Sequence, residues 1–287
     1  MHTFIVGGGF LGSKIQDYFS QNGVQTTTTS FESKNFEKLD IMDKKAVEKF
    51  FSYHKPENSV LCASMSDVEQ CEAFPEKARL INVEGTRNVF EACRKNRSRL
   101  VFISSDYVFD GLKGNYSETD TENPMQVYGR TKLEGEKIVL QEPENLVVRV
   151  STLYGSSSVM KKTFHWHVVE RLSKGVIVPA AFDQVTSPTL IDDVAIALFS
   201  LVEKNKSGLF HCAGNQALTR YGFAQAIAKK YGFDEKLVKK VSMREFNWRA
   251  KRPADSSLSI KKLNSHQVFM KNVDQGLTHV LNGHAGA

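Results

Sequence analysis

Short apolar runs alternate with amphipathic stretches through the first half of the chain. The runs at residues 3–6 and 100–104 are nearly all apolar and too short for a helix, which is typical of buried strands. The stretches between such runs carry apolar residues at helical spacing. We expect strands at residues 3–6, 24–29, 59–63, 100–104 and 145–149, and helices at 11–21, 43–54, 75–97 and 126–140. This alternation predicts a Rossmann-type α/β fold, a doubly wound parallel sheet with helices on both faces.

The pattern loosens after residue 155, which predicts a second and smaller part of the chain. We expect helices at residues 161–174, 192–202 and 219–231, and a strand at 208–212. Gly175 and Gly232 follow two of these helices and predict their C-terminal ends. We therefore divide the chain into a dinucleotide-binding domain at residues 1–155, completed by about 183–212, and a smaller substrate-binding part at 156–182 and 213–287.

A glycine loop follows the first predicted strand and opens the first predicted helix, with the sequence Gly-Gly-Gly-Phe-Leu-Gly at residues 7–12. In this context each spaced glycine has a task. Gly7 allows a tight turn, Gly9 lets the backbone approach a pyrophosphate, and Gly12 lets helix and strand pack closely. Phe10 and Leu11 begin the helix, whose amides and dipole attract phosphates. These five residues are predicted cofactor contacts.

The end of the second predicted strand bears on the choice of cofactor. Ser30, with Lys34 just beyond it, offers a hydroxyl and a cation, which suit a 2′-phosphate. We therefore expect NADPH, with NADH as the alternative. Asp40, ahead of Ile41, is expected beside the adenine, with a helix N-cap as its alternative role. Ala63, at the end of the third strand, completes the predicted cofactor residues.

Candidate catalytic groups occur at the next strand and helix. Tyr128 and Lys132 are four residues apart and share one helical face, while Ser105 ends a predicted strand, where parallel sheets bind ligands. Ser105 would hold a substrate carbonyl, Tyr128 would give it a proton, and Lys132 would lower the pKa of Tyr128 and bind the nicotinamide ribose. Tyr128 and Lys132 therefore count as cofactor contacts too. Ser104 should face the opposite way. Asn82 could join a proton relay or be an ordinary buried amide.

Composition limits the classes of partner. The chain has 287 residues, a net charge of +6 and 41% hydrophobic residues, and its lysine pairs are scattered, so we expect no nucleic-acid partner. No apolar run approaches ~18–20 residues and no signal peptide precedes the first strand, so we expect a cytoplasmic protein without a membrane partner. His165 and His167 are spaced to face different sides of a helix, so we expect no metal.

Several longer motifs carry a family resemblance over nearly the whole chain, to about Leu263. The chain resembles the extended short-chain dehydrogenase/reductases and, among them, the dTDP-4-dehydrorhamnose reductase group. The motifs are Ser-Asp-Tyr-Val-Phe-Asp-Gly at 105–111, Tyr-Gly-Arg-Thr-Lys-Leu-Glu-Gly-Glu at 128–136, segments within 148–155 and 183–189, and Arg-Pro-Ala-Asp-Ser-Ser-Leu at 252–258. The resemblance implies that Ser105, Tyr128 and Lys132 are catalytic. Leu153 departs from the family, whose members often have a tryptophan there.

The resemblance also implies a nucleotide-diphosphate sugar as substrate. The substrate contacts that it implies are Ser105, Asp106, Val108, Tyr128 and Arg252. Cations are expected to hold the diphosphate, and ion pairs or plain surface charge are their alternative roles. The candidate cations are Arg149, Lys161, Lys162, Arg249 and Arg252.

The leading expectation is an NAD(P)H-dependent reductase of the 4-keto group of a nucleotide-diphosphate 6-deoxysugar, acting in dTDP-L-rhamnose biosynthesis, with a homodimer as its expected assembly. One alternative is a sugar-nucleotide epimerase or dehydratase. The acidic pair expected of a dehydratase after the strand hydroxyl is replaced by Asp106-Tyr107, which disfavours that chemistry. Another alternative is an NADP-binding regulatory subunit resembling the methionine adenosyltransferase β-subunit, which would need a partner enzyme.

Overall fold

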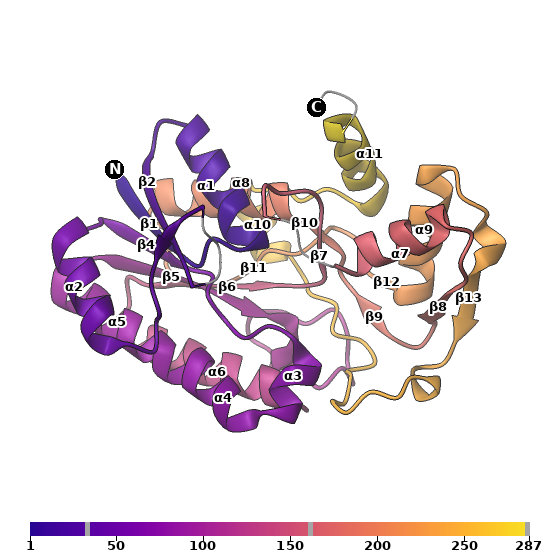
Figure 1. The fold of residues 1–287 in the computed structure, drawn as a ribbon, viewed down its shortest axis with the longest axis horizontal. Helices are drawn as coiled ribbons and strands as arrows, with labels where there is room; N and C mark the ends of the chain where they lie inside the picture. Colours follow the sequence, from indigo (N-terminus) through magenta and orange to yellow (C-terminus); the bar gives the residue numbers. More distant parts are fainter. Residues whose placement is uncertain (32–34, 160–162, 285–287) are drawn as a thin grey trace.

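A seven-stranded parallel sheet forms the centre of the molecule in the computed structural model, which describes residues 1–31, 35–159 and 163–284 (Figure 1). Its strand order is β11-β6-β5-β4-β1-β2-β3. The strands are β1 (His2–Val6), β2 (Gln25–Ser30), β3 (Glu37–Lys38), β4 (Asn58–Leu61), β5 (Arg99–Ser105), β6 (Leu146–Val150) and β11 (Gly208–His211). The order reverses between β1 and β4, which is where a doubly wound sheet opens a crevice for ligands. The predicted Rossmann-type class is confirmed.

Helices cover both faces of this sheet (Figure 1). One layer contains α1 (Phe10–Gln21) and α8 (Ile191–Glu203), and the other contains α2 (Lys44–His54), α5 (Gly85–Asn96) and α6 (Val127–Val139). Alternate residues of β5 pack into two separate cores. Val101 and Ile103 join the core beneath α1 and α8, whereas Leu100 and Phe102 join the core beneath α2 and α5. Burial on both faces explains why this strand reads as a continuous apolar run.

The predicted helix at 75–97 is one helical stretch with a change of pitch. It consists of α4 (Pro75–Arg79), a π-helical turn (Leu80–Glu84) and α5. A short helix, α3 (Val68–Ala73), precedes it and was not expected. The π-helical turn contains the buried side chain of Asn82, which bonds outside its own helix.

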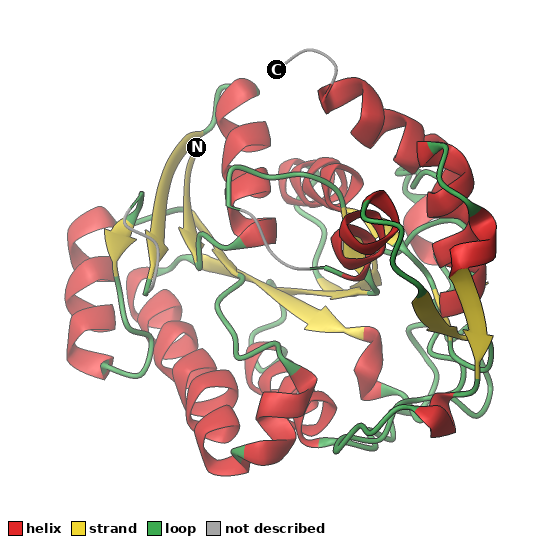
Figure 2. Ribbon diagram, turned by 45° about the vertical axis from the view of Figure 1, so that its right-hand side comes forward, coloured by secondary structure: helices red, strands yellow, loops and turns green. Residues whose placement is uncertain are grey.

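A smaller part packs beside the carboxyl-terminal side of the sheet (Figure 2). Its apolar core joins residues of three helices, Leu172, Phe223 and Leu277 among them. The helices are α7 (Phe164–Ser173), α9 (Arg220–Tyr231) and α11 (Val273–His284), and α10 (Lys261–Ser265) lies nearer the sheet. Short paired strands complete it: β7 (Leu153–Tyr154) with β10 (Thr189–Leu190), β8 (Val178–Ala181) with β13 (Val238–Val241), and β9 (Val185–Thr186) with β12 (Leu218–Thr219).

The domain division stays a proposal, supported by the position of residues 183–212. This stretch supplies α8 and β11, which belong to the helix layer and the edge of the large sheet. None of the helices in the described ranges is both long and apolar enough to cross a membrane.

Candidate active site

The glycine loop joins β1 to α1 in a conformation that two of its glycines require. Gly7 has a φ of 107°, and a Cβ there would lie 2.3 Å from the backbone nitrogen of Ala63. A Cβ on Gly12 would lie 2.0 Å from the carbonyl oxygen of Gly7. A Cβ on Gly9, by contrast, would meet no described atom within 4 Å. Gly7 and Gly12 therefore allow the chain to pack, whereas Gly9 leaves open space at the start of α1.

A cleft of about 680 Å³ opens at this loop, along the carboxyl ends of β1, β4 and β5. Gly9 is the N-cap residue of α1 and provides no side-chain cap, so the first-turn amides of Phe10 and Leu11 are available to phosphates. Both residues, together with Gly7, Gly9, Gly12 and Ala63, line the cleft. These residues fit a dinucleotide.

The structure describes some of the residues that were predicted to bind the adenosine half of the cofactor. Ser30 ends β2, while Lys34 lies outside the described residues. The carboxylate of Asp40 accepts a hydrogen bond from the backbone of Met42 at 2.9 Å. Its alternative role as a helix cap is wrong, because Asp43 caps α2. Ile41 is buried against Gly85, where a Cβ would come within 2.6 Å of its side chain. Their contacts with the cofactor stay predictions.

Ser105, Tyr128 and Lys132 all line the same cleft. Ser105 ends β5, and Tyr128 and Lys132 lie on successive turns of α6. The helix reaches this position because Gly129 packs against the segment after β5: a Cβ on Gly129 would lie 2.0 Å from the carbonyl oxygen of Tyr107. A hydroxyl, a phenol and an ammonium thus face one space, next to the glycine loop.

Burial dominates the protonation of this group. It raises the pKa of Tyr128 above its ordinary value, while a hydrogen bond with Ser105 acts in the opposite direction. It also lowers the pKa of Lys132 to about 8, against the influence of Glu136. The expected lowering of the Tyr128 pKa by Lys132 is therefore wrong for this geometry, in which the Lys132 ammonium lies over the Phe102 ring, 4.0 Å from its centroid. Tyr128 is a neutral phenol near pH 7.

Ser104 faces away from Ser105, as the alternation of a strand predicts. Its hydroxyl donates to Glu136 on α6. The Glu136 carboxylate also accepts two bonds from the buried guanidinium of Arg149, at 2.9 Å from Nε and 2.6 Å from Nη2. Arg149 has a second carboxylate partner in Glu122. Arg149 is thus a structural partner of carboxylates rather than a diphosphate ligand.

Asn82 is a buried amide with local partners. Its oxygen accepts from the Met65 backbone at 2.8 Å, and its nitrogen donates to the Met65 carbonyl at 3.1 Å and to Thr131 at 3.0 Å. It therefore ties the segment after β4 to α6. These bonds favour the buried-amide role over the relay.

The implied substrate residues differ in their surroundings. The carboxylate of Asp106 lines the cleft but is only 3% exposed, and three serine hydroxyls donate to it. Val108 does not fit its predicted role, because its side chain is fully buried in the core. Arg252 pairs with Glu69 at 2.8 Å, so the ion-pair alternative describes it in this structure. Its guanidinium also lies over the ring of Trp248.

Of the remaining candidate cations, the one that the structure describes does not line the cleft. Arg249 is exposed, and its backbone nitrogen donates to Glu69 at 2.8 Å. Lys161 and Lys162 lie outside the described residues. In the described ranges no group of three metal-ligating side chains is placed to hold an ion, and His165 bonds the Tyr231 hydroxyl at 3.0 Å.

Arg220 is a cleft residue that sequence reasoning missed. It is the first residue of α9, lines the cleft, and places its guanidinium 5.0 Å from the Phe164 ring centroid. A cation in the first turn of a helix opposes the helix dipole, so it is favourable mainly where an anion binds nearby. That unusual position, directly after the capping residue Thr219, is the signal that could have identified Arg220.

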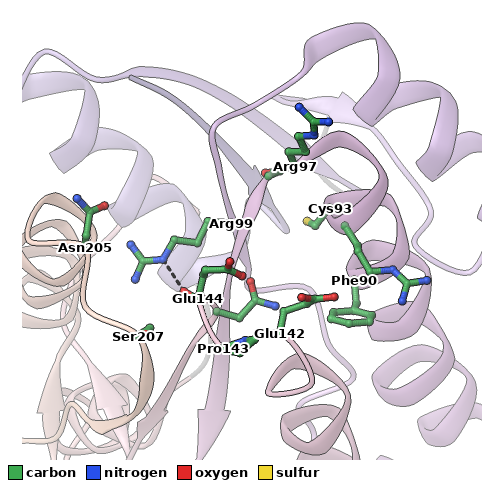
Figure 3. A pocket seen from close by; sticks show the side chains of 12 residues that line it. Phe90, Cys93, Arg97, Arg99, Glu142, Pro143, Glu144, Asn205 and Ser207 are labelled. Atoms are coloured by element: carbon green, nitrogen blue, oxygen red, sulfur yellow. Dashed lines mark hydrogen bonds between the residues drawn. The ribbon is translucent and has the colours of Figure 1, made fainter.

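A second cleft, of about 710 Å³, lies at the amino ends of β5, β6 and β11. Figure 3 shows the side chains that line it. Arg94, Arg97, Arg99 and Glu142 are among its lining residues. Arg99 has a structural task there, since its Nε donates to the Glu144 carbonyl at 2.9 Å. The edge at the amino ends of parallel strands is not where such sheets bind ligands. Tyr128, Ser105 and the glycine loop all line the first cleft.

Comparison with known proteins gives consistent matches. A family model described as the RmlD substrate binding domain matches residues 1–285. A dTDP-4-dehydrorhamnose reductase from Aggregatibacter actinomycetemcomitans is 32% identical over 270 residues, 89% of each chain. The methionine adenosyltransferase 2 subunit beta of Bos taurus is 33% identical over 78% of this chain and 70% of its own. The crystal structure of dTDP-4-dehydrorhamnose reductase from Bacillus anthracis in complex with NADP superposes with a TM-score of 0.91, at 26% identity, covering 98% of this chain and 99% of that one.

Proposed function

The chain belongs to the RmlD substrate binding domain family, and from this premise we propose that it reduces the 4-keto group of a nucleotide-diphosphate 6-deoxysugar of the dTDP-4-dehydrorhamnose kind. It is an oxidoreductase that uses NADPH. The observation that carries the proposal is the gathering of Ser105, Tyr128 and Lys132 in the cleft that begins at the glycine loop.

Tyr128 is the proton donor of the proposed reaction. Its burial keeps the phenol neutral, so the proton is present when the substrate arrives. When bound, NADPH supplies the hydride for the carbonyl carbon. As negative charge develops on the carbonyl oxygen, Tyr128 transfers its proton to it, and the Ser105 hydroxyl orients that oxygen.

Lys132 provides positive charge beside the acid. In this geometry the ammonium lies over the Phe102 ring and the pKa of Tyr128 stays raised, so we give Lys132 a role toward the cofactor rather than toward the phenol. We propose that the same ammonium donates hydrogen bonds to the nicotinamide ribose of the cofactor. Glu136, one turn further along α6, favours the charged form of Lys132.

Arg220 is our candidate ligand for the diphosphate of the substrate. Within the described part of the chain, Arg220 and Lys132 are the cations that line the cleft. A guanidinium binds phosphate oxygens through paired hydrogen bonds, and Arg220 lies across the cleft from the Rossmann strands, on α9.

A regulatory subunit is the second candidate, supported by the similarity to methionine adenosyltransferase 2 subunit beta. The match to the same subunit of Mus musculus covers 89% of this chain, as the reductase match does, but 79% of the length of that subunit against 89% of the reductase. The presence of an acid, a hydroxyl and an ammonium in one cleft favours the enzyme. We further propose that the protein acts in the cytoplasm as a homodimer, which cell fractionation and analytical ultracentrifugation test.

The proposed function is tested by mixing the purified protein with dTDP-4-keto-6-deoxy-L-lyxo-hexulose and following the loss of NADPH absorbance, with NADH in parallel. We expect rapid oxidation of NADPH and slower oxidation of NADH. Binding of NADPH without any oxidation would contradict the reductase and favour the regulatory subunit.

A further inference from the structure

A lysine at the edge of the large sheet lies next to the end of the second Rossmann strand. Lys38 is the last residue of β3, and it pairs in parallel with Ser30, the last residue of β2. We propose that Lys38 selects NADPH over NADH by binding the 2′-phosphate of the adenosine ribose. This inference rests on the proposed function, because it concerns the cofactor of that reaction.

The topology brings this lysine to the edge of the sheet that carries the glycine loop. β1, β2 and β3 are neighbours and run parallel, so their carboxyl ends lie at one edge. The loop follows β1 at that edge, and the amides of Gly7 and Gly8 donate to the Thr29 carbonyl at 3.0 Å and 2.7 Å. In dinucleotide-binding sheets the adenosine ribose lies just beyond the end of the second strand. Ser30 and Lys38 therefore flank the expected ribose position.

The alternation of side chains places the lysine on the face of the sheet that α1 covers. Thr26 of β2 points to this face, since its hydroxyl bonds with that of Ser20 on α1 at 2.9 Å. Ser30 lies four residues further along β2 and faces the same way, as does its partner Lys38. Because α1 begins at the predicted phosphate site, Lys38 lies on the side of the sheet that carries this site.

The neighbouring acids do not face this position. Glu37 precedes Lys38 in β3, so its side chain lies on the other face, where its carboxylate is 3.9 Å from a ring nitrogen of His54 on α2. Asp40, the next acid along the chain, accepts from a backbone amide of its own turn. β2 itself ends in the hydroxyl of Ser30, whereas a carboxylate there would hold the 2′-hydroxyl of NAD. The strand end thus offers a hydroxyl and a cation to a 2′-phosphate.

The ammonium of Lys38 is accessible and keeps its charge. The residue is exposed, and in the described ranges no carboxylate forms an ion pair with it. Its Nζ lies 5.6 Å from the centroid of the Phe31 ring, which is itself 58% exposed. A ring face attracts a cation without neutralising it, so Phe31 restrains the side chain beside the end of β2 and leaves its charge for a phosphate. Lys34, which the sequence suggested for this role, lies outside the described residues.

Fluorescence titration of the whole protein with NADPH and with NADH tests the proposal. Lys38→Gln keeps a long polar side chain and removes the charge. We expect the Kd for NADPH to rise roughly 10- to 100-fold, because a hydrogen bond between two charged groups is lost. The Kd for NADH should change less than about twofold, since NADH has no 2′-phosphate. Equal weakening of both nucleotides, or an unchanged Kd for NADPH, would overturn the proposal.

Two further variants separate this contact from a general effect of charge. Lys45→Gln, at an exposed position of α2, removes the same charge from the protein and should leave both Kd values unchanged. Lys38→Arg keeps a cation at the site and should retain most of the preference for NADPH. A Lys45→Gln variant that weakens NADPH as much as Lys38→Gln does, or a Lys38→Arg variant as weak as Lys38→Gln, would overturn the proposal.

Fragments of the cofactor locate the effect on the 2′-phosphate itself. Calorimetry compares adenosine 2′,5′-bisphosphate with adenosine 5′-monophosphate, which differ only in that group. We expect the wild type to bind the bisphosphate at least about tenfold more tightly, and Lys38→Gln to bind the two alike. Equal affinities in the wild type would overturn the proposal. A wild type that prefers the bisphosphate but does not reduce the ketosugar would contradict only the proposed function, since neither fragment takes part in turnover.

Discussion

At the scale of single residues, the central assignment is that Tyr128 is the acid. Tyr128→Phe removes the phenolic proton but keeps the ring, so we expect kcat to fall roughly 10²- to 10⁴-fold while NADPH binds as before. Steady-state kinetics and cofactor fluorescence measure the two quantities. A Phe variant with near wild-type kcat would refute the assignment.

Tyr116→Phe is the matched control for this change. Tyr116 is a buried tyrosine outside the lining of the cleft, and its hydroxyl donates to Asp110 at 2.6 Å. The control removes a hydroxyl that has two hydrogen-bond partners outside the cleft, Asp110 and the Lys113 backbone, so it should lower stability without a comparable loss of kcat. A similar loss of kcat in both variants would indicate a general structural effect.

Gly9 separates cofactor binding from folding. A Cβ there meets no described atom within 4 Å, and the φ of −83° is open to any residue. We expect Gly9→Ala to fold with wild-type stability but to bind NADPH at least about tenfold more weakly, because the methyl group occupies space that the pyrophosphate approaches. Gly283→Ala, near the end of α11, is the control. Fluorescence titration and urea unfolding give the two readouts, and unchanged affinity in Gly9→Ala would contradict the phosphate role.

The sequence predicted residues whose place follows from local rules. Ser105, Tyr128 and Lys132 were assigned because a strand end and a four-residue helical spacing are local features. The sequence left the roles of Arg149 and Arg252 open between diphosphate ligand and ion pair, because their partners are set by the tertiary fold. Glu136 and Glu69 are distant from them in sequence, and no local pattern announces such pairs.

At the scale of elements, α6 carries most of the chemistry. Tyr128, Lys132 and Glu136 follow one another at four-residue intervals on this helix. Gly135 lets the helix approach the sheet, since a Cβ there would lie 2.8 Å from the Phe102 ring. Lys132 lies over the same ring. Gly129 and Gly135 thus let the helix approach the sheet and the segment after β5, while Lys132 and Glu136 carry charge along one of its faces.

The pH dependence of the rate should report Lys132. Burial lowers the pKa of Lys132 from 10.5 to about 8, so the ammonium is present below that pH and lost above it. Because the charged form supports the reaction, we expect kcat to be constant near neutral pH and to fall as the pH rises through about 8. A kcat that stays constant up to pH 10 would contradict this role of Lys132.

Glu136→Gln should move that fall to lower pH, because the carboxylate favours the charged form of Lys132. Glu134→Gln, on an exposed position of the same helix, should leave the profile unchanged. Profiles of kcat against pH for the two variants check the expectation. The same shift in both, or in neither, would contradict a specific action of Glu136.

Elements were predictable where a periodic pattern was strong. Six of the seven strands of the large sheet and the helices on its faces follow from the apolar and β-branched pattern, whereas β3, which consists of two exposed charged residues, was missed. The π-helical turn was not predictable, because it depends on bonds from Asn82 to a distant loop. Helix α11 was also missed, since its apolar face is defined only by packing against the other helices of the smaller part.

At the scale of the whole molecule, the sheet and the smaller part meet at one site. The glycine loop, Ser105 and Tyr128 come from the Rossmann sheet and its helices, whereas Phe164 and Arg220 reach the same cleft from α7 and α9. Ser256 bonds to Asp106 beneath it. We propose that the Rossmann part holds the cofactor and the catalytic groups, and that the smaller part adds substrate contacts.

The most direct test of this account is the transfer of deuterium from [4,4-²H₂]NADPH to dTDP-4-keto-6-deoxy-L-lyxo-hexulose, followed by mass spectrometry and NMR of the sugar. We predict one deuterium on the former carbonyl carbon, a new hydroxyl at that carbon, and loss of both in Tyr128→Phe. A sugar recovered without deuterium, from a protein that is shown to bind NADPH, would contradict the claim that this cleft reduces a nucleotide-linked ketosugar.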